Sequence, residues 1–534
     1  MRVTFVALGW EQLGVSLLSS IAKQRGHEVR LAFSPSLFND RAHLNIPFLA
    51  RCFDDRKDVM TAIERQRPDV LAFSALTGTY QWMLGVAQDA KRLFPDVKIV
   101  FGGVHASAVP DRVAAQLCVD YVCVGEGDVA FAMILEAIER GGATAPIVNT
   151  RYRSAGGRII RGPQAGFIED LDSLPDFDKT LWEEYIPIGD SYITMTSRGC
   201  PYRCTFCFNS FFVQLPDEGA GKYIRQRSVD HVMHELLQAK KRYKLRGIEF
   251  FDDVFTLDKK WLKCFLDRYK AEIKVPFQCF THVNYIDDDV ARWLSDAGCF
   301  ASQIGVQSMD DEYKRTKIKR YERASDVEKT VRIMRRFAIH AKFDHMFGLP
   351  GEGIEAQEIA RKFYVEHPPY SIQTYWTNYF PGTELLQQGL GLGLIGAEDV
   401  ERIEEGLGCD LYSKSNANID PEKMKAYQAY QIIFKLIPNV PYVVRRRLDP
   451  EFFARMPVGV CALMSFMADV LIGLAKWSPD HILYAKYYLY HMGRFLLRKL
   501  GINIPPATRR EAMPEEDRNK PCKLKSGQEK LVVK

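Results

Sequence analysis

Strand-like apolar runs alternate with helical segments twice along this chain, over residues 1–142 and again over 189–394. In the first stretch, VTFVAL, DVLAFSAL and VKIVFGG each precede a segment with helical periodicity. This rhythm is typical of a parallel sheet with helices on both faces. The pattern therefore predicts two separate α/β domains.

The second stretch contains about six strand-helix units, which begin at YITMTSRGC, RGIEFFDD, VPFQCFTHV, FASQIGVQS, HAKFDHMFGLPGE and IQTYWTNYFPGTEL. Six such units predict a full or partial barrel, a (β/α)6 relative of the TIM barrel. Barrel chemistry gathers at the carboxyl ends of the strands, so the loops after these six runs are the places to search.

The chain has 534 residues, whereas hydrophobic cores stop growing beyond roughly 250 to 300 residues. We expect a first α/β domain, a linker with proline and polar residues, a barrel, a C-terminal helical domain and a polar tail, over residues 1–142, 143–188, 189–394, 395–501 and 502–534.

Composition constrains the partners only weakly. Seventy-two basic and 67 acidic residues give a net charge of +5, too small to predict a nucleic-acid surface. The twelve cysteines are scattered apart from one group, which favours a reducing compartment and metal binding over disulfides. The N-terminus does not resemble a signal peptide, so we expect a cytoplasmic protein.

Four loops of the first domain are rich in small or polar residues: Gly9–Gly14, Ser74–Thr79, Gly102–Ser107 and Gly125–Asp128. Each follows a predicted strand, and ligands of open parallel sheets bind outside the carboxyl ends of the strands. Any single glycine there is also explained by turn formation. The four loops together favour a bulky ligand.

The densest chemical signal is the segment Cys200-Pro-Tyr-Arg-Cys204-Thr-Phe-Cys207. Three thiolates on one loop can hold three irons of a cubane and leave the fourth iron open. Zinc is the main alternative, but a closed structural zinc site needs a fourth ligand, and no such partner follows nearby.

This segment resembles the CxxxCxφC signature of the radical S-adenosylmethionine superfamily, in which φ is aromatic and is here Phe206. The resemblance implies a 4Fe-4S cluster on Cys200, Cys204 and Cys207. Its open iron would bind S-adenosylmethionine and generate a 5'-deoxyadenosyl radical that abstracts hydrogen from the substrate.

Later strands also resemble cofactor-contact positions of that superfamily. Asp252 and Asp253, after Glu249 on the second strand, would meet the methionine amino group. In GVQS, Gln307 and Ser308 would meet the ribose, with Gln307 in place of the usual glutamate. Arg320 would face the carboxylate of S-adenosylmethionine, although a basic run is also typical of a solvated helix face.

The segments FGGVHASAVPD and VDYVCVGEGD resemble paired motifs of cobalamin-binding domains fused to radical enzymes, and imply a Rossmann-like, flavodoxin-like first domain. The implied cobalamin contacts are Glu11, Gln12, Leu13, Ser74, Leu76, Thr77, Gly102, Gly103, Val104, His105, Gly125 and Glu126.

The chain lacks the D-x-H-x-x-G segment that supplies a histidine to cobalt in other cobalamin proteins. The cobalamin would then be base-off, with its lower face open, bound by water or approached by Leu76 or Thr77. We interpret His105 as a contact to the corrin or its tail.

The helical region contains a thirteen-residue apolar run, Met456–Ala468, that Asp469 interrupts, whereas a bilayer span takes about 20 apolar residues. A second stretch, His481–Leu500, mixes tyrosines with basic residues and fits either an interfacial helix or core packing. The interfacial alternative implies contact with a membrane surface and a hydrophobic small-molecule substrate.

The resemblance favours methyl transfer to an unactivated carbon, with an electron donor such as flavodoxin or ferredoxin. Radical cyclisation or rearrangement of a porphyrin-like or lipid substrate is the enzymatic alternative. A non-catalytic iron-sulfur or cobalamin sensor is a third.

Overall fold

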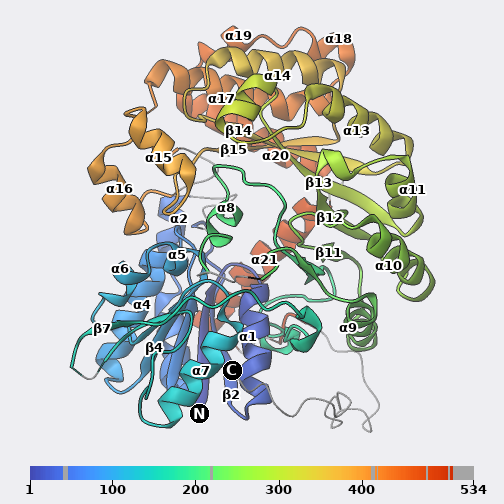
Figure 1. The fold of residues 1–534 in the computed structure, drawn as a ribbon. Helices are drawn as coiled ribbons and strands as arrows, with labels where there is room; N and C mark the ends of the chain where they lie inside the picture. The colour runs from blue at the N-terminus through green and yellow to red at the C-terminus, as the bar shows by residue number, and fades with distance from the viewer. Residues whose placement is uncertain are drawn as a thin grey trace.

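The structure is a computed structural model that describes residues 1–39, 46–154, 156–216, 221–409, 415–417, 419–476, 479–502 and 505–508. Two α/β halves, each built around its own sheet, lie one above the other in Figure 1. Both expected alternations are therefore confirmed as separate sheets.

The first sheet has the strand order β2-β1-β3-β4-β5-β6-β7. Its first five strands are parallel and follow the flavodoxin-like order 2-1-3-4-5. The strands are Arg2–Leu8, Glu28–Ser34, Val70–Ser74, Lys98–Gly102, Tyr121–Cys123, Thr150–Arg153 and Ile159–Arg161.

Helices cover both faces of this sheet because the buried strands are apolar on both sides. Two helices pack together on one face, α1 (Leu13–Gln24) and α7 (Gly127–Glu139). The opposite face buries side chains of α3 (Arg56–Gln66) and α4 (Tyr80–Leu93). The shorter helices of this half are Pro47–Cys52, Gly103–Ala108 and Pro110–Ala114.

The segment between the halves contributes to the first sheet. Strands β6 and β7, which lie within the expected linker 143–188, form an antiparallel hairpin on the edge of β5. Two 3-10 turns follow, Leu171–Ser173 and Lys179–Leu181. Residues 150–153 and 159–161 are thus strands of the first sheet.

The second sheet has the order β15-β14-β13-β12-β11-β8, and all of its strands are parallel. In chain order the strands are Tyr192–Thr194, Ile248–Phe250, Phe277–Thr281, Cys299–Gln307, His340–Phe347 and Ser371–Trp376. The helices between them are α8 (Phe208–Phe212), α9 (Val229–Arg242), α10 (Lys259–Glu272), α11 (Asp288–Asp296), α12 (Asp311–Lys317), α13 (Ala324–Arg336) and α14 (Ile354–Glu366). This is the six-unit partial barrel that the sequence predicts.

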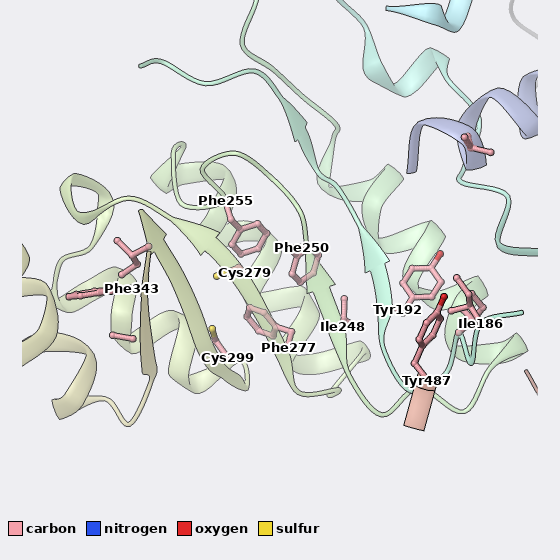
Figure 2. Close-up of a cluster of buried hydrophobic side chains, with 14 of the residues drawn as sticks. Ile186, Tyr192, Ile248, Phe250, Phe255, Phe277, Cys279, Cys299, Phe343 and Tyr487 are labelled. Carbon is pink, nitrogen blue, oxygen red and sulfur yellow. The ribbon is translucent and has the colours of Figure 1, made fainter. Parts of the chain in front are cut away.

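An aromatic core joins the barrel strands to the helices around them. Phe250 stacks on Phe255 at 4.6 Å between ring centroids and meets Phe277 edge-on at 5.4 Å. Figure 2 shows this group beside Ile248, Cys279 and Cys299. Because side chains alternate along a strand, the residues between these positions face the barrel interior.

The C-terminal region is helical and contacts both halves. Its helices are α15 (Glu384–Gly391), α16 (Ala397–Glu404), α17 (Pro421–Leu436), α18 (Tyr442–Arg445), α19 (Pro450–Ala454), α20 (Val458–Lys476) and α21 (Pro479–Lys499), with a 3-10 turn at Ile437–Asn439. Figure 1 shows α17 beside α14 and β15. The same view shows α21 between the two halves.

Helix α21 buries its aromatic face in the protein, as in the core-packing alternative. Tyr487 and Tyr488 are 3% and 7% exposed. The Tyr487 ring stacks on Trp10 at 4.1 Å, and the Tyr488 hydroxyl accepts a hydrogen bond from Phe38 N at 3.2 Å. No helix among the described ranges is long and apolar enough to cross a membrane.

The end of the chain is described only in part. Within the expected tail, Thr508 packs on the connecting segment, where its hydroxyl accepts from Ile188 N at 3.0 Å. The rest of that prediction, residues 509–534, lies outside the described residues.

Candidate cofactor sites at the carboxyl ends of two sheets

The cysteine loop follows β8 and a two-residue strand, β9 (Ser197–Arg198). Cys207 N donates to Cys204 O at 3.0 Å, which closes the turn. Between these cysteines, Leu385 N donates to Thr205 O at 2.9 Å, and the Thr205 hydroxyl donates to Lys317 O at 3.3 Å. These bonds tie the loop to segments that follow β13 and β15, so it lies at the carboxyl end of the barrel.

The three thiols share one environment. Burial, with smaller contributions from neighbouring cysteines and Asp253, raises the pKa of Cys200 to about 11 and that of Cys207 to about 12. Burial likewise raises the pKa of Cys204, which Arg320 opposes. Neutral thiols in this setting would become thiolates on binding iron, because a coordinating metal deprotonates them.

This donor set fits a cubane. Each thiolate of a 4Fe-4S cluster binds a different iron, so the three sulfurs need not converge on one point. Across the described ranges no three His, Cys, Asp or Glu side chains are close enough to hold a single ion. The three thiols lie near enough to one another to affect each other's pKa, and their number matches three of the four irons.

The two adjacent carboxylates after β11 have different environments. Asp252 is 1% exposed and accepts hydrogen bonds from Thr196 N at 3.0 Å and from the Ser197 hydroxyl at 2.5 Å. Asp253 is exposed and accepts from Asn209 Nδ2 at 2.9 Å, close enough to Cys200 and Cys207 to affect their pKa values. Of the pair, Asp253 is the carboxylate placed to meet a cationic amine beside the cluster.

Arg320 lies against the cysteine loop, with its Nη1 3.9 Å from Cys204 Sγ. Its other nitrogens donate to Glu322 Oε1 at 2.7 Å and to Gly305 O at 2.5 Å. The guanidinium is therefore held in place beside the cluster position before any ligand arrives.

Sequence reasoning missed a layer of side chains behind this loop. Glu322 pairs with Arg320 and approaches His282 Nε2 at 3.4 Å, and these partners lower the pKa of Glu322 to about 2 although burial opposes the shift. His282 stacks on Tyr202 of the cysteine segment at 4.2 Å. The tyrosine between the first two cysteines could have indicated such a partner, whereas nothing in the sequence indicated His282 or Glu322.

The predicted ribose residues lie at the end of β13. Gln307 has φ 68°, in the left-handed region, which a residue other than glycine occupies only when its surroundings require it. Ser308 is fully buried, and its hydroxyl donates to Glu352 Oε1 at 2.7 Å. Phe206 packs between apolar clusters that include Tyr379 and Leu349.

The first domain holds a cavity of about 180 Å³ between its sheet and helices α1 and α7. Five predicted contacts line it: Ser74, Gly102, Gly103, Gly125 and Glu126. The other lining residues are Phe5, Gly14, Leu17, Leu18, Ala72, Phe73, Val100, Cys123, Gly127, Asp128, Phe131 and Arg198.

Glycine is required at the mouth of this cavity. Gly103 has φ 89°, and a Cβ there would lie 2.7 Å from Ala75 N and 2.8 Å from Ala75 O. Gly103 begins the short helix α5 (Gly103–Ala108), which also contains His105. Gln12, which precedes α1, has a buried Oε1 without a hydrogen-bond partner. Gln12 is not among the residues that line the cavity, but five of those residues are glycines, which leave room for a bulky group such as the tail of base-off cobalamin.

The predicted acidic contacts are engaged within the protein. Glu11 is paired with Lys179 at 2.5 Å, and both side chains are under 5% exposed. Glu126 binds Arg225 at 2.8 Å. Their carboxylates hold loops in place, so any contact they make with cobalamin remains a prediction.

His105 is also enclosed. Its ring lies 4.3 Å from that of Tyr80, tilted by 35°, and its Nδ1 lies 3.3 Å from the Thr77 hydroxyl. Burial lowers the pKa of His105 to about 4. On the same loop as Thr77, Leu76 is 54% exposed. Leu13 and Val104 are half-buried. Leu76 is thus the accessible residue of the pair predicted to approach cobalt.

Two known families cover these two sites. Residues 3–135 match the B12 binding domain, and residues 194–363 match the Radical SAM superfamily. An uncharacterised methyltransferase of Pyrococcus horikoshii is 27% identical over 395 residues, which cover 72% of this chain and 79% of that protein. Anaerobic magnesium-protoporphyrin IX monomethyl ester cyclase of Rubrivivax gelatinosus is 23% identical over 408 residues, which cover 72% of this chain and 67% of that protein.

Solved structures share the fold. The cobalamin-dependent S-adenosylmethionine radical enzyme OxsB, with aqua-cobalamin bound, superposes with a TM-score of 0.61 at 14% identity over 94% of this chain and 80% of that one. The methyltransferase TsrM from Kitasatospora setae, with cobalamin and a [4Fe-4S] cluster bound, gives 0.56 at 18% identity over 72% and 76%.

The fold, the cavity and the cysteine loop define a radical enzyme with two cofactor domains. The chain belongs to the cobalamin-binding-domain radical S-adenosylmethionine enzymes. Its cofactors are a 4Fe-4S cluster, S-adenosylmethionine and cobalamin.

Proposed function

We propose that this enzyme transfers a methyl group to an unactivated carbon of a small-molecule substrate. The observation that carries the proposal is the contact between the two sites, because Arg198 lines the first-domain cavity and is two residues from Cys200. When bound, the cluster and S-adenosylmethionine supply a radical that abstracts hydrogen, and cobalamin supplies the methyl group.

The residues of the barrel would orient S-adenosylmethionine. Cys200, Cys204 and Cys207 bind the cluster, and Asp253 accepts from the methionine amine. Arg320 stabilises negative charge beside Cys204. Gln307 lies at the end of β13 with a left-handed backbone conformation. Its side-chain amide would donate to the ribose.

The inner face of the barrel suits a substrate with an apolar body and a polar group. The rings of Phe251 and Phe280 lie 5.2 Å apart, tilted by 49°, and these residues alternate with those that face the helices. Deeper along the next strands, Gln303 Nε2 donates to both oxygens of Asp344 at 2.9 and 3.0 Å, and burial raises the pKa of Asp344 to about 7. This carboxyl would bind a hydrogen-bond donor of the substrate.

Product analysis tests methyl transfer. The enzyme is reconstituted anaerobically with the cluster and hydroxocobalamin, and is given a reductant and S-adenosylmethionine. Formation of both S-adenosylhomocysteine and 5'-deoxyadenosine is the expected result. The likeness to a cyclase favours ring closure as a second candidate, which 5'-deoxyadenosine without S-adenosylhomocysteine would support.

We also propose a cytoplasmic location with flavodoxin or ferredoxin as electron donor. All eleven cysteines in the described ranges are free thiols, as a reducing compartment allows. Oxidation of reduced flavodoxin by the enzyme and S-adenosylmethionine would support the donor.

Contact with a membrane surface would involve the exposed leucines of the last two helices, including Leu463, Leu471, Leu489 and Leu496. Liposome flotation of the full chain against a Leu463→Ser/Leu471→Ser variant tests it. Equal flotation of the two would contradict a role for these α20 side chains.

A further inference from the structure

A two-stranded ribbon links the cysteine loop to the first domain. Strand β9 pairs antiparallel with β10 (Arg225–Gln226), and Arg198 lies opposite Arg225. Gly199 and Cys200 follow β9 directly. Any movement of this ribbon therefore moves the first cluster ligand.

Both arginines of the ribbon bind the acidic loop at the start of α7. Arg198 donates to Asp128 through two nitrogens, at 2.8 and 3.0 Å. Arg225 donates to Glu126 in the same two-pronged manner, at 3.0 and 2.8 Å. Such bidentate pairs fix the mutual orientation of two groups as well as their distance.

These ion pairs are shielded from solvent. The Arg225 side chain is 3% exposed, that of Asp128 6% and that of Glu126 16%. Although burial opposes it, Arg225 and Arg198 together lower the pKa of Glu126. Buried charges that lose a partner are costly, so the four side chains have little freedom to separate.

The ribbon contacts both cofactor sites. On one side, Glu126, Asp128 and Arg198 line the 180 Å³ cavity of the first domain. On the other, Gly199 packs so closely on the ribbon that a Cβ would lie 2.4 Å from Tyr223 O. Its φ of 94° also favours glycine.

Tyr223 extends this path to the position proposed for S-adenosylmethionine. Its hydroxyl donates to Asn209 Oδ1, and Asn209 Nδ2 donates to Asp253 at 2.9 Å. A continuous series of contacts thus runs from the cavity wall to the carboxylate proposed to meet the amine.

We propose that Arg198, Arg225, Glu126 and Asp128 form an interdomain clamp that sets the position of the cysteine loop relative to the cobalamin cavity. The four act as positioning residues, through the loops that they hold. Because coupling between two sites is reciprocal, the clamp makes filling of the cavity and the geometry of the cluster interdependent.

The most informative variant is Arg225→Gln, because Arg225 does not line the cavity. Wild type and variant are loaded with hydroxocobalamin and the cluster, and both cofactors are reduced to their paramagnetic states. The dipolar broadening of the cob(II)alamin EPR signal by the reduced cluster reports their separation and orientation. Arg161→Gln, which removes an exposed ion pair of the same domain, is the control.

We expect the wild type and Arg161→Gln to give the same broadening, and Arg225→Gln to lose it or change its shape. S-adenosylhomocysteine formation should fall about fivefold or more in Arg225→Gln, whereas 5'-deoxyadenosine formation without cobalamin stays unchanged. Arg225→Lys, which keeps the charge, should recover part of the signal.

Equal broadening in all variants would overturn the clamp. Arg198→Lys keeps the charge without the two-pronged geometry, and supplies the same comparison if Arg225→Gln does not load. Failure of every clamp variant to hold either cofactor, with a normal control, would also contradict it, because the pairs would then maintain the fold alone. The EPR result needs only bound cofactors, so it stands whether or not the proposed methyl transfer is found.

Discussion

The carboxyl ends of the parallel strands in the two sheets present different surfaces to a cofactor. At the first sheet, two predicted polar contacts are engaged with other residues, since Glu11 pairs with Lys179 and His105 packs against Tyr80. What faces the cavity is largely glycine and apolar surface. At the second sheet, the side chains themselves converge, with three thiols, Asp253 and Arg320 around one loop.

We infer from this difference that the first domain recognises its ligand through the shape of its cavity. The barrel would recognise its ligands through the functional groups of its side chains. A substitution that fills space should therefore harm the first site most. A substitution that removes a functional group should harm the second most. Four variants test this contrast, in order of decreasing expected effect.

Removal of one cluster ligand should have the largest effect. In Cys204→Ala we expect 5'-deoxyadenosine formation to fall on the order of 10³-fold or more, because the cluster loses a ligand that no other side chain replaces. Iron content and product are measured together. Cys264→Ala, at an exposed cysteine of α10, is the matched control and should resemble the wild type.

Gly103→Ala, which places a methyl group against the backbone of Ala75, should have the second largest effect. An alanine there adds about 1–3 kcal/mol of strain from its positive φ, and its Cβ meets the backbone of Ala75. We expect cobalamin affinity to fall roughly tenfold or more, measured by fluorescence quenching. Gly26→Ala has a similar φ of 82° with nothing within 4 Å, so it isolates the strain from the collision. Equal losses in the two would contradict recognition by shape.

Titration of the Glu352 carboxyl in the radical domain should have a smaller effect, which is a pH-dependent change in stability. Burial raises the pKa of Glu352 from 4.5 to about 8, with Ser308, Gln357 and Asp310 facing it. A raised carboxyl pKa stabilises the fold at low pH, and this stability is lost as the pH rises from about 4.5 through 8.

Glu352→Gln keeps the hydrogen-bonding shape and removes this titration. We expect its Tm to be close to the wild-type value near pH 4.5 and higher by about 3 °C or more at pH 9. Calorimetry at both pH values measures the difference. A gap that does not change with pH would contradict the raised pKa.

The smallest effect is expected at the histidine of the first domain. Since the His105 ring is enclosed by Tyr80 and Thr77, we expect His105→Gln to leave the cob(II)alamin EPR spectrum unchanged. Cobalamin affinity should change less than about threefold. Loss of a nitrogen splitting from the wild-type spectrum would show instead that His105 binds cobalt.

Local patterns were enough to predict most of the fold. The five parallel strands of the first sheet and the six of the barrel all coincide with apolar runs of the sequence, because such strands are buried on both faces. The hairpin β6–β7 escaped prediction because its pattern is short and its pairing partner, β5, is distant in sequence.

The site was predictable where one loop holds all the ligands, as with the cysteines. It was not predictable where the chemistry depends on long-range pairs. The bonds of Arg225 to Glu126 and the contact of Glu322 with His282 join residues that lie far apart in the sequence. The tyrosines of α21 showed why periodicity alone cannot assign a surface, since the same pattern suits a membrane interface and the interior contact observed.

The central proposal is that the two cofactor domains serve a single methyl transfer. The most direct test compares cobalamin-loaded and cobalamin-free enzyme, both with intact cluster, supplied with reductant and S-adenosylmethionine labelled on its methyl group. We predict 5'-deoxyadenosine from both forms and S-adenosylhomocysteine only from the loaded form. S-adenosylhomocysteine from the cobalamin-free enzyme, or none from the loaded enzyme, would contradict the claim.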